Sequence, residues 1–547
     1  MNSFQHQRGR FLTGALLSAI LLAFSVAAKA ETWPLTLKKL NPPDDPTAAA
    51  DSNYLFFMLS NNGSEQSFQA QVGPAGKNRI EWPGMAEKTA EFQKIVKKEP
   101  KYQSDYPFRG VAELGSKKYA FALDVVPPVP KAEKPKPDAQ AKKPDAEQSQ
   151  KEATEPQDKK ADPPPKKFRG YNRLYFDFNG NGDLTDDKIV SAESTPETEG
   201  FNPLAGEWAS FQFPEIEVAL DVEGTKFDYA CSFSGYLRTG EDVRYASVSL
   251  QSPNYREGDI TLDGKTTHVI LLDSNCNGRF DDAASVAPSA APNEPLNLVE
   301  GDSLLLDFPA AKKVERVAWN RTNFDEYRRW ISKIVDIDGR YYNLKITPAG
   351  DKISLEEVEV PTGNITNPND GFSAVIYSDK CVLKISGNKD APISVPAGRW
   401  KLLSYKIDRT KIEEAEIPEK KPETPKQSIV QALGKSLLGA SVGTIVPTMP
   451  RRHDTYVEAQ ATSAYKEVEV RQGETVVMPF GPPYKPHVEV GNFDDEKQTA
   501  RLSLSLVGSA GEVCSDLEVK GGRPPKPEFT IIDPQDKLVV KGAFEYG

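Results

Sequence analysis

Apolar and polar residues alternate along several stretches of this chain, among them Leu502–Leu506, Val468–Val470 and Val358–Val360. A period of two places successive side chains on opposite faces of an extended backbone, so each stretch predicts a β-strand with one buried face. Such stretches recur over most of the sequence. We therefore expect a mostly β protein built from several sandwich-like domains, with disordered and short helical insertions.

Turn residues separate many of these predicted strands. Glu223-Gly224, Asp263-Gly264 and Asp338-Gly339 each lie between two extended runs. A two-residue hairpin turn needs positive φ at its central residues, which Gly accepts and Asp tolerates. The pattern predicts antiparallel hairpins at these three places and a looser one around Gly115.

Two stretches have helical spacing instead. The first is 86–99, which carries Phe92, Ile95 and Val96. The second lies in an insertion at about 411–455, where Thr424 and Pro425 precede a run with Ile429, Val430, Leu433 and Leu437 on one face. The apolar spacing predicts a short helix at both places. At the second place Pro425 supports it, because Pro is favoured in the first turn of a helix.

Residues 127–167 form a second insertion of unusual composition. They include ten Pro and ten Lys and contain no Leu, Ile or aromatic residue. Such a segment buries too little apolar surface to offset the entropy of ordering, so we expect disorder with polyproline character. Strand-like runs flank it at Lys118–Asp124 and Tyr171–Asp177. We therefore expect an insertion between neighbouring strands of one domain.

The first thirty residues have the features of a secretory signal peptide. Arg8 and Arg10 precede an apolar stretch from Phe11 to Val26, and Ala28-Lys-Ala30 is a small-x-small cleavage site. No later run is long and apolar enough to form a transmembrane helix. These features predict an exported protein, periplasmic or extracellular, with no transmembrane segment in the mature chain.

The 547-residue length predicts several domains, because one hydrophobic core stops growing well below this size. We expect a β domain at 31–195 that carries the insertion 127–167, and a second at 196–310. A third is expected at 311–480 with the insertion at about 411–455, followed by a small C-terminal β-sandwich at 481–547. Four cysteines permit disulfides in an exported protein, and Cys231–Cys276 is the pairing we favour because both should lie in one domain. The alternative is that the cysteines are small apolar residues of strands.

The charge of the chain excludes one class of partner. The formal net charge is −11, and it becomes −14 when the three basic residues of the predicted signal peptide are removed. An acidic protein is a poor ligand for nucleic acid. We expect its partner to be an extracellular or cell-envelope protein or a glycan, and no nucleic acid.

Two acidic segments have the spacing of a metal-binding loop. They run from Asp177 to Asp187 and from Asp273 to Asp282, and each begins Asp-x-Asn-x-Asn-Gly. Oxygen side chains at every second position, followed by Gly where the backbone turns sharply, are typical of a loop around a hard cation such as Ca²⁺.

A twelve-residue calcium loop takes side-chain oxygens from positions one, three and five, a backbone carbonyl from seven and an acid from twelve. Lys188 and Ala284 stand at position twelve here, so nearby acids must substitute. The candidate metal ligands are Asp177, Asn179, Asn181, Asp183 and Asp187 in the first loop, and Asp273, Asn275, Asn277, Arg279, Asp281 and Asp282 in the second. We expect weak binding, with a Kd of about 10⁻⁴–10⁻³ M. The alternative is a metal-free loop in which the same side chains accept backbone N–H groups.

The segments LYFDFNGNGDLTDD and HVILLDSNCNGRFDD resemble the degenerate EF-hand or dockerin-like loops of large exported bacterial β-proteins. The segment FGPPYKPHVEV and the closing KGAFEYG resemble the C-terminal sandwich of the same proteins. This resemblance implies calcium-stabilised loops and no enzymatic activity.

The remaining motifs do not assemble a reaction centre. Gly439–Gly443 reads G-x-S-x-G, but a helical run precedes Ser441, which is the reverse of a nucleophile elbow. We assign no catalytic residue. We expect an exported binding or structural protein with Ca²⁺-stabilised loops. The alternative is a secreted hydrolase that acts on polysaccharide or peptide through carboxylates in a cleft.

Overall fold

The computed structural model of the chain describes residues 30–40, 65–71, 85–126, 170–192, 207–239, 244–287, 293–308, 326–410, 454–494 and 499–546. The predicted signal peptide, the insertion 127–167 and residues 411–453 of the other insertion, including Ser441, lie outside them. The described residues are mostly β-strands in several separate sheets, which confirms the predicted fold class. The helix expected at 86–99 is present as α3 (Met85–Ile95).

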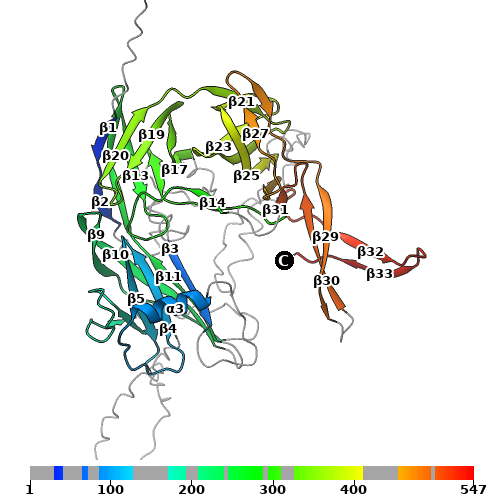
Figure 1. Cartoon of the computed structure of the whole chain (residues 1–547). Helices are drawn as coiled ribbons and strands as arrows, with labels where there is room; N and C mark the ends of the chain where they lie inside the picture. The colour runs from blue at the N-terminus through cyan, green and yellow to red at the C-terminus, as the bar shows by residue number, and fades with distance from the viewer. Residues whose placement is uncertain are drawn as a thin grey trace, which may run out of the picture.

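One hydrophobic core lies between two sheets, which we call the first sandwich (Figure 1). The first sheet has the order β4–β5–β6–β7, and the second has the order β3–β11–β10–β8, with β9 paired to the first half of β10. This core takes strands from both sides of residue 195. The strands are β3 (Glu65–Gln71), β4 (Phe108–Leu114), β5 (Lys117–Asp124), β6 (Arg173–Phe176), β7 (Val190–Ser191), β8 (Glu207–Gln212), β9 (Ile216–Val222), β10 (Thr225–Thr239) and β11 (Arg244–Gln251).

In the second sandwich, the first strands of the described chain pair with strands that come more than two hundred residues later. Its sheets have the orders β17–β16–β13–β12–β2 and β1–β20–β19–β18, and both contribute to one core. The strands are β1 (Glu31–Pro34), β2 (Thr36–Lys39), β12 (Asn254–Leu262), β13 (Lys265–Leu272), β16 (Ser303–Leu306), β17 (Arg328–Trp330), β18 (Ile334–Ile337), β19 (Arg340–Ile346) and β20 (Lys352–Glu357). A separate ribbon pairs β14 (Ser285–Ala287) with β15 (Asn297–Val299).

The third sandwich contains an eight-stranded sheet ordered β23–β22–β25–β26–β31–β30–β29, with β27 also paired to β25, and a three-stranded sheet ordered β24–β21–β28. Its strands are β21 (Thr362–Thr366), β22 (Phe372–Tyr377), β23 (Val382–Gly387), β24 (Ile393–Pro396), β25 (Gly398–Asp408), β26 (Tyr456–Gln460), β27 (Val468–Val470), β28 (Thr475–Val477), β29 (Lys485–Asp494), β30 (Thr499–Val507) and β31 (Val513–Glu518). The hairpin of β32 (Glu528–Ile532) and β33 (Leu538–Ala543) follows. Figure 1 shows two long hairpins, β29–β30 and β32–β33, projecting from this end of the molecule. The boundaries of independently folding domains remain a prediction.

The predicted hairpin turns are all present. β9–β10, β12–β13 and β18–β19 are antiparallel hairpins, and β4–β5 turns at Gly115. Both central residues of the first three turns have positive φ, for example 50° at Asp263 and 79° at Gly264. The turn chemistry read from the sequence is therefore confirmed.

The strands on either side of the insertion 127–167 pair with each other. β5 and β6 are antiparallel neighbours in the first sandwich. The side-chain amide of Asn172 accepts a hydrogen bond from the Val126 backbone N and donates one to the Val126 carbonyl, at 2.8 Å in both cases. The insertion thus leaves and returns at one place between neighbouring strands, as predicted.

The expected disulfide is not formed. Cys231 and Cys276 are both buried in the core of the first sandwich, but all four cysteines are free thiols. Burial raises the pKa of the Cys231 and Cys276 thiols, so both are held in the neutral form. They act as small apolar core residues.

Candidate functional site: the two acidic loops

Each acidic loop begins immediately after a buried strand. Asp177 follows β6, and Asp273 follows β13. Both side chains are buried, although a carboxylate is costly to remove from water. The loops offset this cost by directing backbone N–H groups at these two carboxylates.

In the first loop, Asp177 accepts hydrogen bonds from the backbone N of Asn181 at 3.0 Å and of Gly182 at 2.9 Å. Asn179 Oδ1 accepts from the same Asn181 N at 2.9 Å, and Asn181 Oδ1 accepts from Asp183 N at 2.6 Å. The Asn181 amide then donates to Asp186 at 2.8 Å. Every side chain at the first, third and fifth positions therefore points into the loop.

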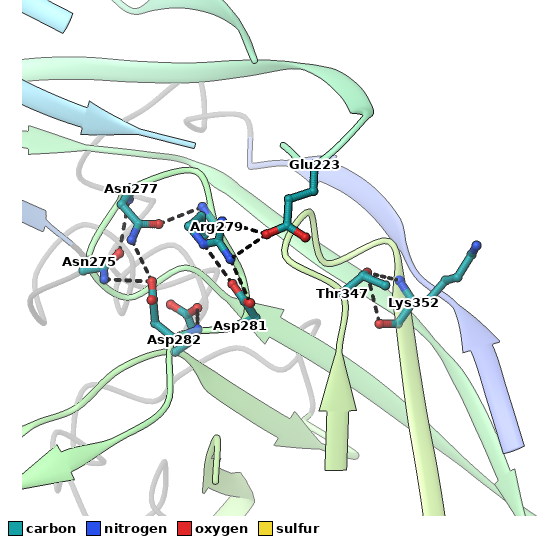
Figure 2. Close-up of polar contacts among 9 residues, drawn as sticks. Glu223, Asn275, Asn277, Arg279, Asp281, Asp282, Thr347 and Lys352 are labelled. Carbon is teal, nitrogen blue, oxygen red and sulfur yellow. Dashed lines mark hydrogen bonds and ion pairs between the residues drawn. The ribbon is translucent and has the colours of Figure 1, made fainter. Parts of the chain in front are cut away.

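The second loop repeats this network position by position. Asp273 accepts from the backbone N of Asn277 at 3.1 Å and of Gly278 at 2.7 Å, and Asn277 N also contacts Asn275 Oδ1 at 3.2 Å. The amides of Asn275 and Asn277 both donate to Asp282 Oδ2, at 3.1 and 2.7 Å (Figure 2). The shared sequence thus specifies one hydrogen-bonded loop structure twice.

The loops differ at the seventh position. Asp183 of the first loop forms an ion pair with Lys98 at 3.0 Å. Arg279 of the second loop turns its guanidinium to Asp281, with contacts of 3.0 and 3.1 Å, and lies 3.5 Å from Glu223 (Figure 2). Two of the candidate ligands, Asp281 and Arg279, therefore form an ion pair with each other.

The first loop also packs against the C-terminal end of α3. Lys97 N donates to the Gly182 carbonyl at 2.8 Å, and Leu184 N donates to the Lys98 carbonyl at 3.0 Å. Gly182 has φ of 83°, and a Cβ there would lie 2.5 Å from the Ile95 carbonyl oxygen. Glycine at this position is therefore required twice, by the turn and by the close approach of the helix.

The second loop lies between the first and second sandwiches. Asn277 O accepts from Gly115 N at 2.5 Å, and Cys276 O accepts from the Gln66 amide at 2.9 Å, both in the first sandwich. On the other side, Phe280 N donates to the Pro348 carbonyl at 3.0 Å, in the turn between β19 and β20. This loop therefore joins two sandwiches in addition to closing on itself.

Sequence reasoning missed two residues that hold the second loop. Asp302, fully buried before β16, accepts from Ser274 N at 3.0 Å and from Asp282 N at 2.9 Å. Tyr229 on β10 donates its hydroxyl to Asp273 at 2.7 Å. Both are remote in sequence from the residues that they contact, so no local spacing signals them.

Burial dominates the electrostatics of these carboxyl groups. It raises the pKa of Asp273 to about 7, opposed by hydrogen bonds from Tyr229, Gly278 and Asn277. Burial and the neighbouring Asp273 raise the pKa of Asp302 as well. In the first loop, burial and the charge of Asp186 raise the pKa of Asp187. Burial, with repulsion between neighbouring carboxyl groups, therefore disfavours the charged form of Asp187, Asp273 and Asp302.

The donor chemistry of the first loop suits a hard cation, because it offers only oxygen ligands from carboxylates, amides and backbone carbonyls. Asp187 contacts Phe178 N through one oxygen at 3.1 Å, which brings this acid back to the start of the loop. In the part of the chain that the structure describes, no three His, Cys, Asp or Glu side chains are grouped as metal ligands. Any bound cation would depend on the asparagine and backbone oxygens as well.

No protein-family model matches the chain, and none of the curated proteins or solved structures compared with it does either. The resemblance to EF-hand or dockerin-like loops therefore rests on the loops themselves. Among the described residues, no helix has the length and apolar character needed to cross a membrane.

Proposed function

We propose that this protein is an exported, non-enzymatic binding or structural component of the cell envelope, with acidic loops that bind Ca²⁺ weakly. The observation that carries this proposal concerns two carboxyl groups whose pKa values burial raises, those of Asp273 and Asp302. Asp273 and Asp302 are buried, and each oxygen of both accepts a hydrogen bond from within the protein. A general acid or base must reach its substrate, so these two groups serve the fold instead.

The β32–β33 hairpin supplies a surface for binding. These strands pair only with each other within the described residues, and their exposed apolar side chains are Ile531, Ile532, Leu538, Val539 and Val540. A two-stranded hairpin alone is marginally stable in water, so a further strand or a packed face would stabilise it. The partner that suits it is an envelope protein that adds an extended apolar strand to one of its edges.

Site-specific photo-crosslinking in cell-envelope preparations tests this binding role. A crosslinker at Val539, which is 62% exposed, should capture one defined protein. The matched control is Val477, an exposed valine of the third sandwich at 60%, which should not capture it. The purified partner should lose affinity for Val539→Glu. Equal capture from both positions, capture of glycan alone, or turnover of polysaccharide or peptide by the purified chain would refute the proposal.

The calcium proposal favours the first loop, where Asp187 is available to close the ligand set. With a Kd of about 10⁻⁴–10⁻³ M and about 10 mM Ca²⁺, binding to the folded state alone adds about 1.4–2.7 kcal/mol of stability. Thermal denaturation in Ca²⁺ and in chelator measures this difference.

The variant Asp187→Asn should lose most of the calcium response, because it removes the closing acid of the first loop. Asp228→Asn changes an exposed acid of β10 outside both loops and should keep the response. Equal melting temperatures with and without Ca²⁺, and no heat of binding by calorimetry, would exclude a calcium site.

A further inference from the structure

The sheet β3–β11–β10–β8 of the first sandwich has two faces of different composition. The side chains of Phe68, Phe211 and Val248 point inward and belong to the core. Successive side chains of a strand point to opposite faces, so the residues that alternate with these three lie on the outward face. Almost all of those outward residues are Ser or Gln.

The strand register arranges these outward residues in rows that cross four strands. One row consists of Ser210 on β8, Tyr236 on β10, Ser247 on β11 and Gln69 on β3. The next row consists of Gln212, Ser234, Ser249 and Ser67 on the same strands. We call these eight residues the hydroxyl face. Its members on β8 and β3 are exposed and those on β10 and β11 are half-buried, and Figure 1 shows β3, β11 and β10 side by side.

The hydroxyl face carries no charged side chain, in a chain of which 27% of the residues are charged. The outward faces of the other sandwiches carry ion pairs, such as His268–Asp259 at 2.9 Å in the second and Lys406–Glu458 at 3.0 Å in the third. Edge strands usually carry charges that block pairing with another chain, yet the edge strands β3 and β8 contribute only Ser and Gln to these rows. The lack of charge is therefore a property of this face.

Two tyrosines lie side by side at one end of this surface. Tyr236 stands between Ser210 and Ser247 across the ladder, so its ring has short side chains on both sides. Tyr245, which is paired with Arg238 in the adjoining row, has its ring centroid 6.1 Å from that of Tyr236. Neither tyrosine belongs to the hydrophobic clusters formed by the described residues. The pair therefore adds aromatic surface to an uncharged surface of hydroxyls and amides.

This combination of groups matches the chemistry of a sugar. Hydroxyl and carboxamide groups both donate and accept hydrogen bonds, as sugar hydroxyls do. An aromatic ring supplies a flat apolar surface on which the C–H face of a sugar ring can pack. Nucleic acids and anionic membranes require several basic groups, and the two rows contain none. Protein interfaces are depleted in Ser, which is the commonest residue of this face. An uncharged glycan is therefore the ligand that the face suits best.

We propose that the hydroxyl face, together with Tyr245, is a binding site for a neutral polysaccharide. The sugar rings pack against Tyr236 and Tyr245, and their hydroxyls form hydrogen bonds with the Ser and Gln side chains. The site lies in the first sandwich, whereas the β32–β33 hairpin follows the third, so this proposal does not rest on the proposed function.

Affinity electrophoresis of the chain from residue 31 tests this site. Native gels containing hydroxyethylcellulose, dextran or galactomannan are compared with a gel that contains no polysaccharide, and at least one should retard the protein. Tyr236→Ala should weaken this binding about tenfold, the effect of losing one aromatic contact, and Tyr236→Phe should keep most of it. The matched control is Tyr255→Ala, which changes a half-buried tyrosine of β12 in the second sandwich and should bind as the unchanged chain does. Circular dichroism checks that each variant folds.

A second variant changes an exposed position, where the substitution leaves the core intact. Gln69→Ala removes an amide from the row of Tyr236 and should weaken binding about threefold, as expected for one lost hydrogen bond. Gln535→Ala, an exposed glutamine between β32 and β33, is its control and should have no effect. Unchanged mobility in all three neutral gels overturns the proposal, and so do equal losses in Tyr236→Ala and Tyr255→Ala. Retardation by anionic polygalacturonate alone assigns the binding to charge and also overturns it.

Discussion

The contact between the first acidic loop and α3 gives a sharp test of the structure, because two glycines of one loop have different surroundings. Gly182 has φ of 83°, and an added Cβ would lie 2.5 Å from the Ile95 carbonyl oxygen and 3.4 Å from Lys97 N. Gly180 has φ of 69°, and an added Cβ there meets nothing within 4 Å. Alanine at Gly180 therefore reports backbone strain alone, and alanine at Gly182 reports strain together with a steric clash.

The two effects differ in size. A non-glycine residue in the left-handed region costs about 1–2 kcal/mol, and this is the full expected cost of Gly180→Ala. At Gly182 the opposing atom is backbone and cannot rotate away, so α3 or the loop must move. That movement strains the hydrogen bond of 2.8 Å from Lys97 N to Gly182 O, and overpacking of this kind adds about 1–3 kcal/mol. We expect a total of about 2–5 kcal/mol for Gly182→Ala.

The chain has several cores, so the clash between α3 and the first loop is best measured by a local probe. Native-state hydrogen exchange of peptides covering 85–98 and 177–188 gives the local opening free energy instead. Gly182→Ala should lower this free energy by about 1–3 kcal/mol more than Gly180→Ala. Equal losses in the two variants would mean that the helix does not approach the loop as closely as described.

Three further predictions follow from the same contacts. Replacing residues 127–167 with a short Gly/Ser turn should leave the melting temperature nearly unchanged, because β5 and β6 already pair with each other. The entropic cost of closing a loop of n residues grows only as (3/2)RT ln n, so its length matters little. An unfolded product would contradict this prediction. Because burial raises the pKa of Asp273 to about 7 from 3.8, the folded protein keeps a proton that the unfolded chain releases, and stability should fall as pH rises between these values. Asp273→Asn should flatten that fall in chelator-containing denaturation series at pH 5 and pH 7.5, and an unchanged slope would refute the assignment. Tyr229→Phe removes the hydroxyl that donates to Asp273 and should lower the free energy of unfolding by about 1.5–3 kcal/mol above pH 7. The loss should be smaller at pH 5, where the Asp273 carboxyl is protonated. Equal losses at both pH values would count against this prediction.

The parts of the fold that the sequence predicted depend on local chemistry. The turn at Asp263-Gly264 needs two residues with positive φ, and Asp followed by Gly is enough to predict it without knowledge of the rest of the chain. The spacing Asp-x-Asn-x-Asn-Gly likewise specifies a closed loop, because each side chain caps an N–H only two to five residues ahead. Hydrogen bonds between residues so close along the chain can be predicted from the spacing of residue types in the sequence.

The parts that the sequence did not predict depend on contacts remote along the chain. β2 pairs with β12, and β3 pairs with β11, although roughly two hundred residues separate the partners. Asp302 and Tyr229 hold the second loop from 20 to 44 residues away. Periodicity shows which face of a strand is buried but not which strand lies beside it, so neither the grouping into sandwiches nor these two residues could be read in advance.

The two acidic loops share a sequence pattern but differ in their surroundings. In the second loop Asp282 accepts two amide N–H groups, Asp281 is paired with Arg279, and Ala283 stands where the first loop has Asp187. That loop is closed by protein groups alone and connects two sandwiches, so a cation would add little to it. The first loop keeps Asp187, whose pKa is raised by burial and by neighbouring carboxylates, and this is why the proposed calcium site is assigned to it. The hydrogen-bonded loop is the structural unit that both segments share, and the calcium proposal turns on the acid at its eleventh position.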